Sequence, residues 1–139
     1  MKLKLGEEIG LYHELNGLSQ QNEEKNVVLM TGILKQKMSL KTKMYLQRLN
    51  NLIMEDIKLH EESRKELFQK LGHEENGQIS IPKENMEEFL KESNNLLTAE
   101  KEINVKSIWG EDFTIDALDK IETEEDYPIL FKVIESVNK

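Results

Sequence analysis

Apolar side chains recur at steps of three or four residues across residues 40–71, a long segment without proline or glycine. The row consists of Leu46, Leu49, Ile53, Ile57, His60, Arg64, Leu67 and Leu71, in which only His60 and Arg64 are polar. This spacing places side chains on one face of an α-helix. Ser39 can cap the helix by accepting a hydrogen bond from a free N–H group of the first turn, and Gly72 is expected to end it in a left-handed conformation. The helix would be roughly 48 Å long at about 1.5 Å per residue, too long for so small a chain to cover completely.

The second half of this row is weakly apolar. His60 and Arg64 stand where a coiled coil would carry leucine or isoleucine. Either this half is a solvated arm flanked by a shorter antiparallel helix, or it pairs with another chain as a coiled coil. The first arrangement is favoured, because Asn76-Gly77 is a strong turn signal. Pro82 can then open a second apolar helix, residues 83–98.

The remaining patterns predict short elements. A short edge strand is expected within residues 1–5, a helix at about 7–16 ending at Gly17, a polar loop at 18–26 and a strand at 27–30. Further short extended pieces are expected around residues 79–81 and 103–105, followed by a turn at Trp109-Gly110 and a short helix at about 115–121. The last helix starts at Asp126-Tyr127-Pro128, with aspartate as its cap. The fold class is therefore mainly α, with an antiparallel helical hairpin and short β segments. Residues 1–139 form a single domain from which the long helix, 39–71, projects as an arm.

The composition fits one domain with a modest core. The chain has 139 residues, of which 37% are hydrophobic and 33% charged. It has no cysteine, which excludes disulfides, thiolate metal sites and cysteine nucleophiles. The first eight residues, MKLKLGEE, lack the apolar core of a signal peptide, and no apolar run approaches the roughly 20 residues that span a bilayer. We therefore expect folding inside the cell and no membrane association.

The charge of the chain is unevenly distributed. Residues 25–54 carry six basic side chains and no acid, whereas residues 55–139 carry 11 basic and 22 acidic ones. Such a basic stretch can bind phosphates or an acidic protein surface, or it can be a solvated helix face balanced by the acidic remainder. With one arginine and one aromatic residue in this stretch, nucleic acid is the less favoured partner. We expect a protein partner, and the candidate binding residues are Lys35, Lys37, Met38, Lys41, Lys43, Met44, Tyr45 and Arg48, with Leu40 as a further apolar anchor.

No catalytic, cofactor or metal site is expected. His13, His60 and His73 lie far apart in sequence and lack the spacing of a zinc ligand pair. The seven glycines form no phosphate-binding loop. The acidic cluster of Glu111, Asp112, Asp116 and Asp119 lacks the spacing of a calcium loop, so helix capping and solubility are the favoured roles.

Several segments together resemble a group of short, mainly helical proteins encoded by tailed bacteriophages, including crAss-like phages. These segments are MKL (residues 1–3), LYHELNG (11–17), MSLKTKMYLQRLN (38–50), RKELF (64–68), KLG (70–72), the Asn76-Gly77 turn, IWG (108–110), the region of Asp116 and YPILF (127–131). The likeness covers nearly the full chain and brings no catalytic motif with it.

The resemblance implies a phage gene product that is made in the bacterial cytoplasm. The expected function is that of a non-enzymatic structural or assembly protein of the virion, in the connector, a tail ring or the capsid interior. Its partners would be other virion proteins, or further copies of the chain. The alternative is a host-takeover protein that binds and inhibits a bacterial factor.

Overall fold

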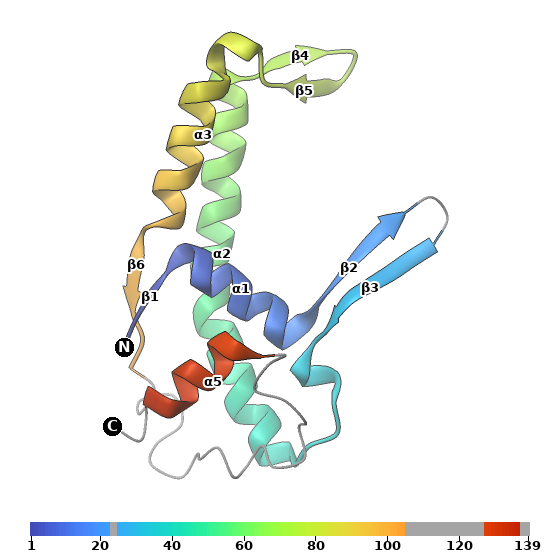
Figure 1. Ribbon diagram of the computed structural model, residues 1–139, viewed down its shortest axis with the longest axis vertical. Coiled ribbons are helices and arrows are strands. Elements are labelled where there is room, and N and C mark those ends of the chain that lie inside the picture. Colours follow the sequence, from blue (N-terminus) through green and yellow to red (C-terminus); the bar gives the residue numbers. More distant parts are fainter. Residues whose placement is uncertain (23–24, 105–126, 137–139) are drawn as a thin grey trace.

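The computed structural model describes residues 1–22, 25–104 and 127–136 and is mainly α-helical, as predicted (Figure 1). In chain order the elements are β1 (Lys2–Lys4), α1 (Leu5–Asn16), β2 (Gly17–Asn22), β3 (Lys25–Thr31), the 3-10 turn η1 (Ile33–Lys35), α2 (Leu40–Leu71), β4 (His73–Glu75), β5 (Gln78–Ser80), α3 (Lys83–Leu97), β6 (Glu100–Glu102) and α5 (Pro128–Glu135). The expected turn at Trp109-Gly110, the helix at 115–121, the acidic cluster and the cap at Asp126 lie outside the described residues.

Helix α2 forms where the apolar row predicted it. Its first turn is capped by Ser39, whose hydroxyl oxygen accepts a hydrogen bond from the backbone N–H of Thr42 at 3.2 Å. Gly72 ends the helix, but the expectation of a left-handed residue is wrong, because its φ of -86° is extended. Glycine is required there by space instead: a Cβ atom would collide with the carbonyl oxygen of Phe68 and the side chain of Ile79.

Helix α3 and the second half of α2 form the predicted antiparallel hairpin, which projects from the rest of the molecule (Figure 1). Asn76 and Gly77 both have positive φ, 54° and 79°, as a tight two-residue turn between β4 and β5 requires. The Phe68 and Phe89 rings lie 5.0 Å apart between the helices. No residue of α3 is fully buried, so the hairpin, here called the arm, is a two-helix structure with wide solvent exposure.

The core lies in the lower part of the molecule, where α1 and α5 pack near the first half of α2 (Figure 1). Its fully buried side chains include Leu11, Leu15, Leu49, Ile53 and Leu130. Helix α5 begins at Pro128, as predicted, but the residue at its N-cap position is Tyr127, which makes no side-chain capping hydrogen bond, and not Asp126. Its first turn is also stabilised by α1, because the buried Glu14 carboxylate accepts hydrogen bonds from the backbone N–H groups of Ile129 at 3.3 Å and Leu130 at 3.0 Å.

Strands β1 and β6 pair antiparallel, with Leu3 opposite Lys101, and tie the start of the chain to the end of α3. The extended piece expected at 103–105 is thus displaced to 100–102, because the register with β1 selects which residues pair. Ile103 follows the strand and is completely buried.

A second difference from the prediction concerns residues 18–26. Gly17–Asn22 form strand β2, which pairs with β3, whereas a polar loop was expected. Polar side chains such as Ser19 and Gln20 are accommodated because this strand faces solvent, while β3 satisfies its backbone groups.

Candidate protein-binding surfaces

The basic residues predicted to bind a partner lie on the solvent side of the first turns of α2. Lys41, Lys43 and Arg48 are exposed and flank the buried side of the helix, which carries Leu46 and Leu49, with Lys43 on one flank and Lys41 and Arg48 on the other. Between them two apolar side chains also face solvent, Leu40 at 85% and Met44 at 45% exposure. We call these five exposed residues of α2, Leu40, Lys41, Lys43, Met44 and Arg48, the basic surface.

The other predicted binding residues are placed differently. Lys35 and Lys37 are exposed on the segment between β3 and α2, and Met38 is half-buried against the core. Tyr45 is only 9% exposed and belongs to the core. Its ring lies beneath the Lys41 ammonium, at 5.8 Å, and the Arg48 guanidinium, at 5.5 Å, so it orients the two cations rather than offering a contact of its own.

The hairpin of β2 and β3 is a second surface, which sequence reasoning predicted only as a strand. It projects away from α1 and α2 into solvent (Figure 1). Val27, Val28 and Leu29 of β3 are 44%, 62% and 56% exposed, and Leu18 of β2 is 37% exposed. Because successive side chains of a strand point to opposite faces, both faces of this hairpin carry apolar groups. The signal in the sequence is the continuous run of residues 27–30, a pattern typical of strands that are covered on both faces.

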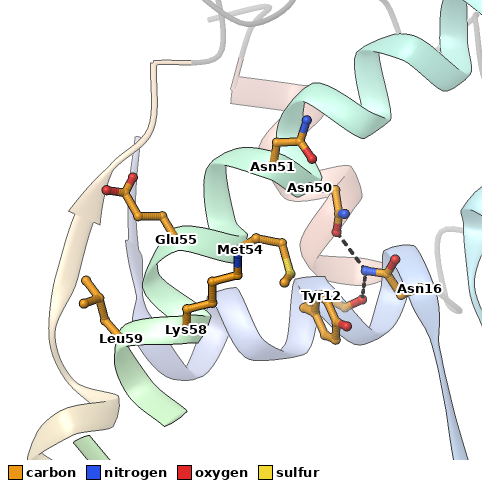
Figure 2. A pocket seen from close by; sticks show the side chains of 8 residues that line it. All are labelled: Tyr12, Asn16, Asn50, Asn51, Met54, Glu55, Lys58 and Leu59. Carbon is orange, nitrogen blue, oxygen red and sulfur yellow. Dashed lines mark hydrogen bonds between the residues drawn. The ribbon is translucent and has the colours of Figure 1, made fainter. Parts of the chain in front are cut away.

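A groove of about 690 Å³ lies between α1 and α2, and Figure 2 shows the side chains that line it. They are Tyr12, Asn16, Asn50, Asn51, Met54, Glu55, Lys58 and Leu59. The Asn16 amide donates hydrogen bonds to the Tyr12 carbonyl at 3.0 Å and to the Asn50 Oδ1 atom at 2.8 Å. These contacts join α1 to α2, and the exposed Asn51 leaves an amide facing solvent at the groove.

A buried carboxyl group, Glu8, lies at the contact between α1 and α2. It is 1% exposed, and burial, followed by the neighbouring Asp56 carboxylate, raises its pKa from 4.5 to about 8. Glu8 is therefore mostly protonated at neutral pH and can donate its proton to Asp56. Asp56 in turn lies 3.5 Å from the Lys101 ammonium, which also donates to the Leu52 carbonyl. Glu8, Asp56 and Lys101 thus connect α1, α2 and β6.

Glu8 and Asp56 also line a cavity of about 250 Å³, together with His60 and Ser63 of α2. Burial and then the nearby Arg64 charge lower the pKa of His60, so its imidazole is largely neutral at pH 7. Among residues 1–22, 25–104 and 127–136, no cluster of three or more histidine, aspartate or glutamate side chains is arranged to hold a metal ion. In the same ranges no helix is long and apolar enough to cross a membrane.

Comparison of the chain with protein-family models, with curated protein sequences and with solved structures finds no match.

Proposed function

We propose that this chain is a non-enzymatic structural or assembly protein of a bacteriophage particle that acts through protein–protein contacts. The observation that carries the proposal is the projecting hairpin of β2 and β3, which exposes apolar side chains on both faces. The phage context comes from the resemblance of the sequence to short phage proteins. Contact with a protein is the part of the proposal that the geometry supports.

The hairpin is better suited to a partner than to solvent. A two-stranded hairpin is marginally stable by itself in water, and it gains stability when a third strand or a helix covers it. Among the described strands β3 pairs only with β2, so its outer backbone edge can pair with a further strand, and Val28 and Leu29 would fill apolar sites on either side of that strand. We infer that the partner contributes an apolar strand or groove that covers β3.

The basic surface would orient the same encounter. Exposed charges contribute little affinity, about 0–1 kcal/mol for each surface pair, but they raise the rate of association and select the orientation. An acidic partner is favoured because Lys41 and Arg48 lie over the same Tyr45 ring and no acidic residue occurs between positions 25 and 54. Leu40 and Met44 supply apolar contact area beside them.

The experiment that tests the function is quantitative mass spectrometry of purified particles of the phage that encodes the chain. A fixed number of copies per particle is expected. Absence from particles would contradict the virion proposal.

A pair of hairpin variants tests the surface. Replacing Val28 and Leu29 with threonine keeps β-propensity and removes apolar area from side chains that are already more than half exposed. We expect the far-UV circular dichroism of the free protein to be unchanged and the number of copies per particle to fall at least severalfold. The matched control replaces Ser19, the exposed cross-strand partner of Val28, with threonine and should incorporate normally. Equal incorporation of both proteins would show that the hairpin is not the contact surface.

A host-takeover protein is the second candidate, and the charge of the arm favours it. Residues 55–102 carry 13 acidic and seven basic side chains, and Glu84, Glu88 and Glu92 follow one another at four-residue steps on the exposed side of α3. Such a row could compete with nucleic acid for a basic bacterial protein. Early expression without incorporation into particles would support this function over the first.

A further inference from the structure

Four charged side chains of α2 lie seven residues apart, which is two helical turns, and therefore lie along one face of the helix. In order they are Lys41, Arg48, Glu55 and Glu62. All four are exposed, on the side of α2 away from the buried Leu49. The sign of the charge reverses once, between Arg48 and Glu55, so this charged row has a basic half and an acidic half of equal length.

We propose that α2 pairs antiparallel with α2 of a second copy of the chain, about a two-fold axis that passes between residues 51 and 52. In this arrangement Lys41 lies opposite Glu62 of the second copy, and Arg48 lies opposite Glu55 of the second copy. The two-fold axis repeats both contacts, so the row forms four ion pairs with itself. A parallel pairing would place like charges opposite each other, and the charges therefore select the antiparallel orientation.

The apolar side chains on this side of α2 obey the same symmetry. Met44 and Leu59 are 45% and 55% exposed, and they lie equally far from the proposed axis on either side. Antiparallel pairing consequently brings Met44 of each copy to Leu59 of the other. The uncharged Asn51 is exposed next to the axis itself, where a charge would meet its own copy.

The long side chains of the row can reach a partner helix without disturbing the fold. The Glu55 side chain is 75% exposed, and the Lys101 ammonium lies 4.0 Å from it, at the limit of an ion pair. The Arg48 guanidinium lies over Tyr45 but remains exposed. Helix α1 crosses α2 (Figure 1), and within the described part of the chain Glu55 and Leu59 line the groove between the two helices while the four charged side chains of the row stay exposed.

A second copy fits this surface better than an unrelated protein does. An interface about a two-fold axis must be self-complementary, because residue i contacts residue j and residue j contacts residue i. A sign reversal at the midpoint of the row, with Met44 and Leu59 in mirrored positions, satisfies that requirement. An unrelated partner would require complementary charges but no such mirror relation. The inference rests on α2 and does not involve the hairpin, but it assigns Lys41, Arg48 and Met44 of the basic surface to a second copy of the chain.

Charge exchange tests the pairing, with sedimentation velocity at several protein and NaCl concentrations as the measurement. We expect the wild type to form a dimer whose dissociation constant rises with salt. Lys41→Glu with Arg48→Glu should weaken the dimer at least tenfold, and adding Glu55→Lys with Glu62→Lys to the same chain should restore it. Glu84→Lys with Glu88→Lys, two exposed charges on α3, form the matched control and should leave the dissociation constant unchanged.

The orientation is tested by single cysteines, since the chain has none of its own. Asn51→Cys should form a disulfide-linked dimer under mild oxidation because both copies of residue 51 lie at the axis. Gln69→Cys is the control: it is exposed near the far end of the same side, and in the proposed dimer its two copies are roughly 50 Å apart along the helix axes.

Three results would overturn the proposal: a wild type that is monomeric at every concentration, a fourfold charge exchange that fails to restore the dimer, or equal cross-linking at residues 51 and 69. Assembly beyond the dimer in proportion to concentration would indicate an open head-to-tail contact instead. A monomeric wild type that is still incorporated into particles would refute the dimer and leave the proposed function intact.

Discussion

Replacing Glu8 with glutamine removes an ionisable carboxyl group from the contact between α1 and α2 and keeps a side chain of nearly the same shape. In the folded wild type the pKa of Glu8 is about 8, because of burial and then Asp56, compared with 4.5 for an unperturbed glutamate. The glutamine amide can donate to Asp56 as the protonated acid does. The variant should therefore keep the contact and lose only its dependence on pH.

The sign of the effect follows from the raised pKa. Below pH 4.5 Glu8 is protonated in both the folded and the unfolded chain, and its stabilising contribution is fully present. As the pH rises towards 8 the unfolded chain releases the proton while the folded protein retains it, so this contribution is lost. Each unit between the two pKa values corresponds to about 1.4 kcal/mol, which amounts to roughly 3–5 kcal/mol over the whole interval.

Urea unfolding followed by far-UV circular dichroism, at half-unit steps from pH 4.5 to 8.5, measures this difference. The free energy of unfolding of Glu8→Gln minus that of the wild type should increase steadily by roughly 3–5 kcal/mol and then level off above pH 8. Glu7→Gln is the matched control one residue away. A backbone hydrogen bond from Lys4, opposed by burial and assisted by Lys132, lowers the pKa of Glu7, so that carboxylate stabilises the fold above about pH 4.5. A constant difference for Glu8→Gln across the range would refute a buried, protonated Glu8.

Two further pairs of substitutions test the packing of the helices. Glu14→Ala removes the acceptor for two backbone N–H groups of α5, one of them buried, and should lower the free energy of unfolding by about 1–3 kcal/mol. Glu14→Gln keeps an acceptor oxygen and should therefore lower the free energy of unfolding by less. Leu49→Ala should cost about 2–5 kcal/mol because Leu49 is completely buried, and Leu90→Ala on the arm should cost under about 1 kcal/mol because Leu90 is 52% exposed. Both pairs are measured by urea unfolding at pH 7. Equal losses for the two Glu14 variants would contradict its role as acceptor for α5, and equal losses for Leu49→Ala and Leu90→Ala would contradict their different burial.

The helices could be predicted because their signals are local. The spacing of Leu46, Leu49 and Ile53 and the Asn76-Gly77 turn each act within a few residues, and the structure places them as expected. Gly72 was correctly predicted to end the helix, but the predicted reason, a left-handed conformation, was wrong. Glycine is required there because Phe68 and Ile79 leave no room for a Cβ atom.

Contacts between distant segments could not be predicted in this way. The pairing of β1 with β6 joins residues about 100 positions apart, and the burial of Glu8 depends on Asp56 and Lys101 lying around it. The basic surface was found from charge alone, and Tyr45 was assigned to it although it precedes Leu49 and Ile53 at four-residue steps, the spacing of the buried face. Strand β2 was missed because its polar side chains carry no apolar alternation, and its partner β3 determines its conformation.

The pairing of β1 with β6 also has a consequence for the order in which the chain folds. The turn between β4 and β5 brings α2 and α3 together over short sequence separations, so the arm can form early. Strand β1 and the first turn of α1 must wait for residues 99–103, because the Leu5 N–H donates to the Ala99 carbonyl and the Ile103 N–H donates to the Met1 carbonyl. During synthesis on the ribosome residues 1–5 are made well before residues 99–103, so they are among the last segments to reach their final contacts.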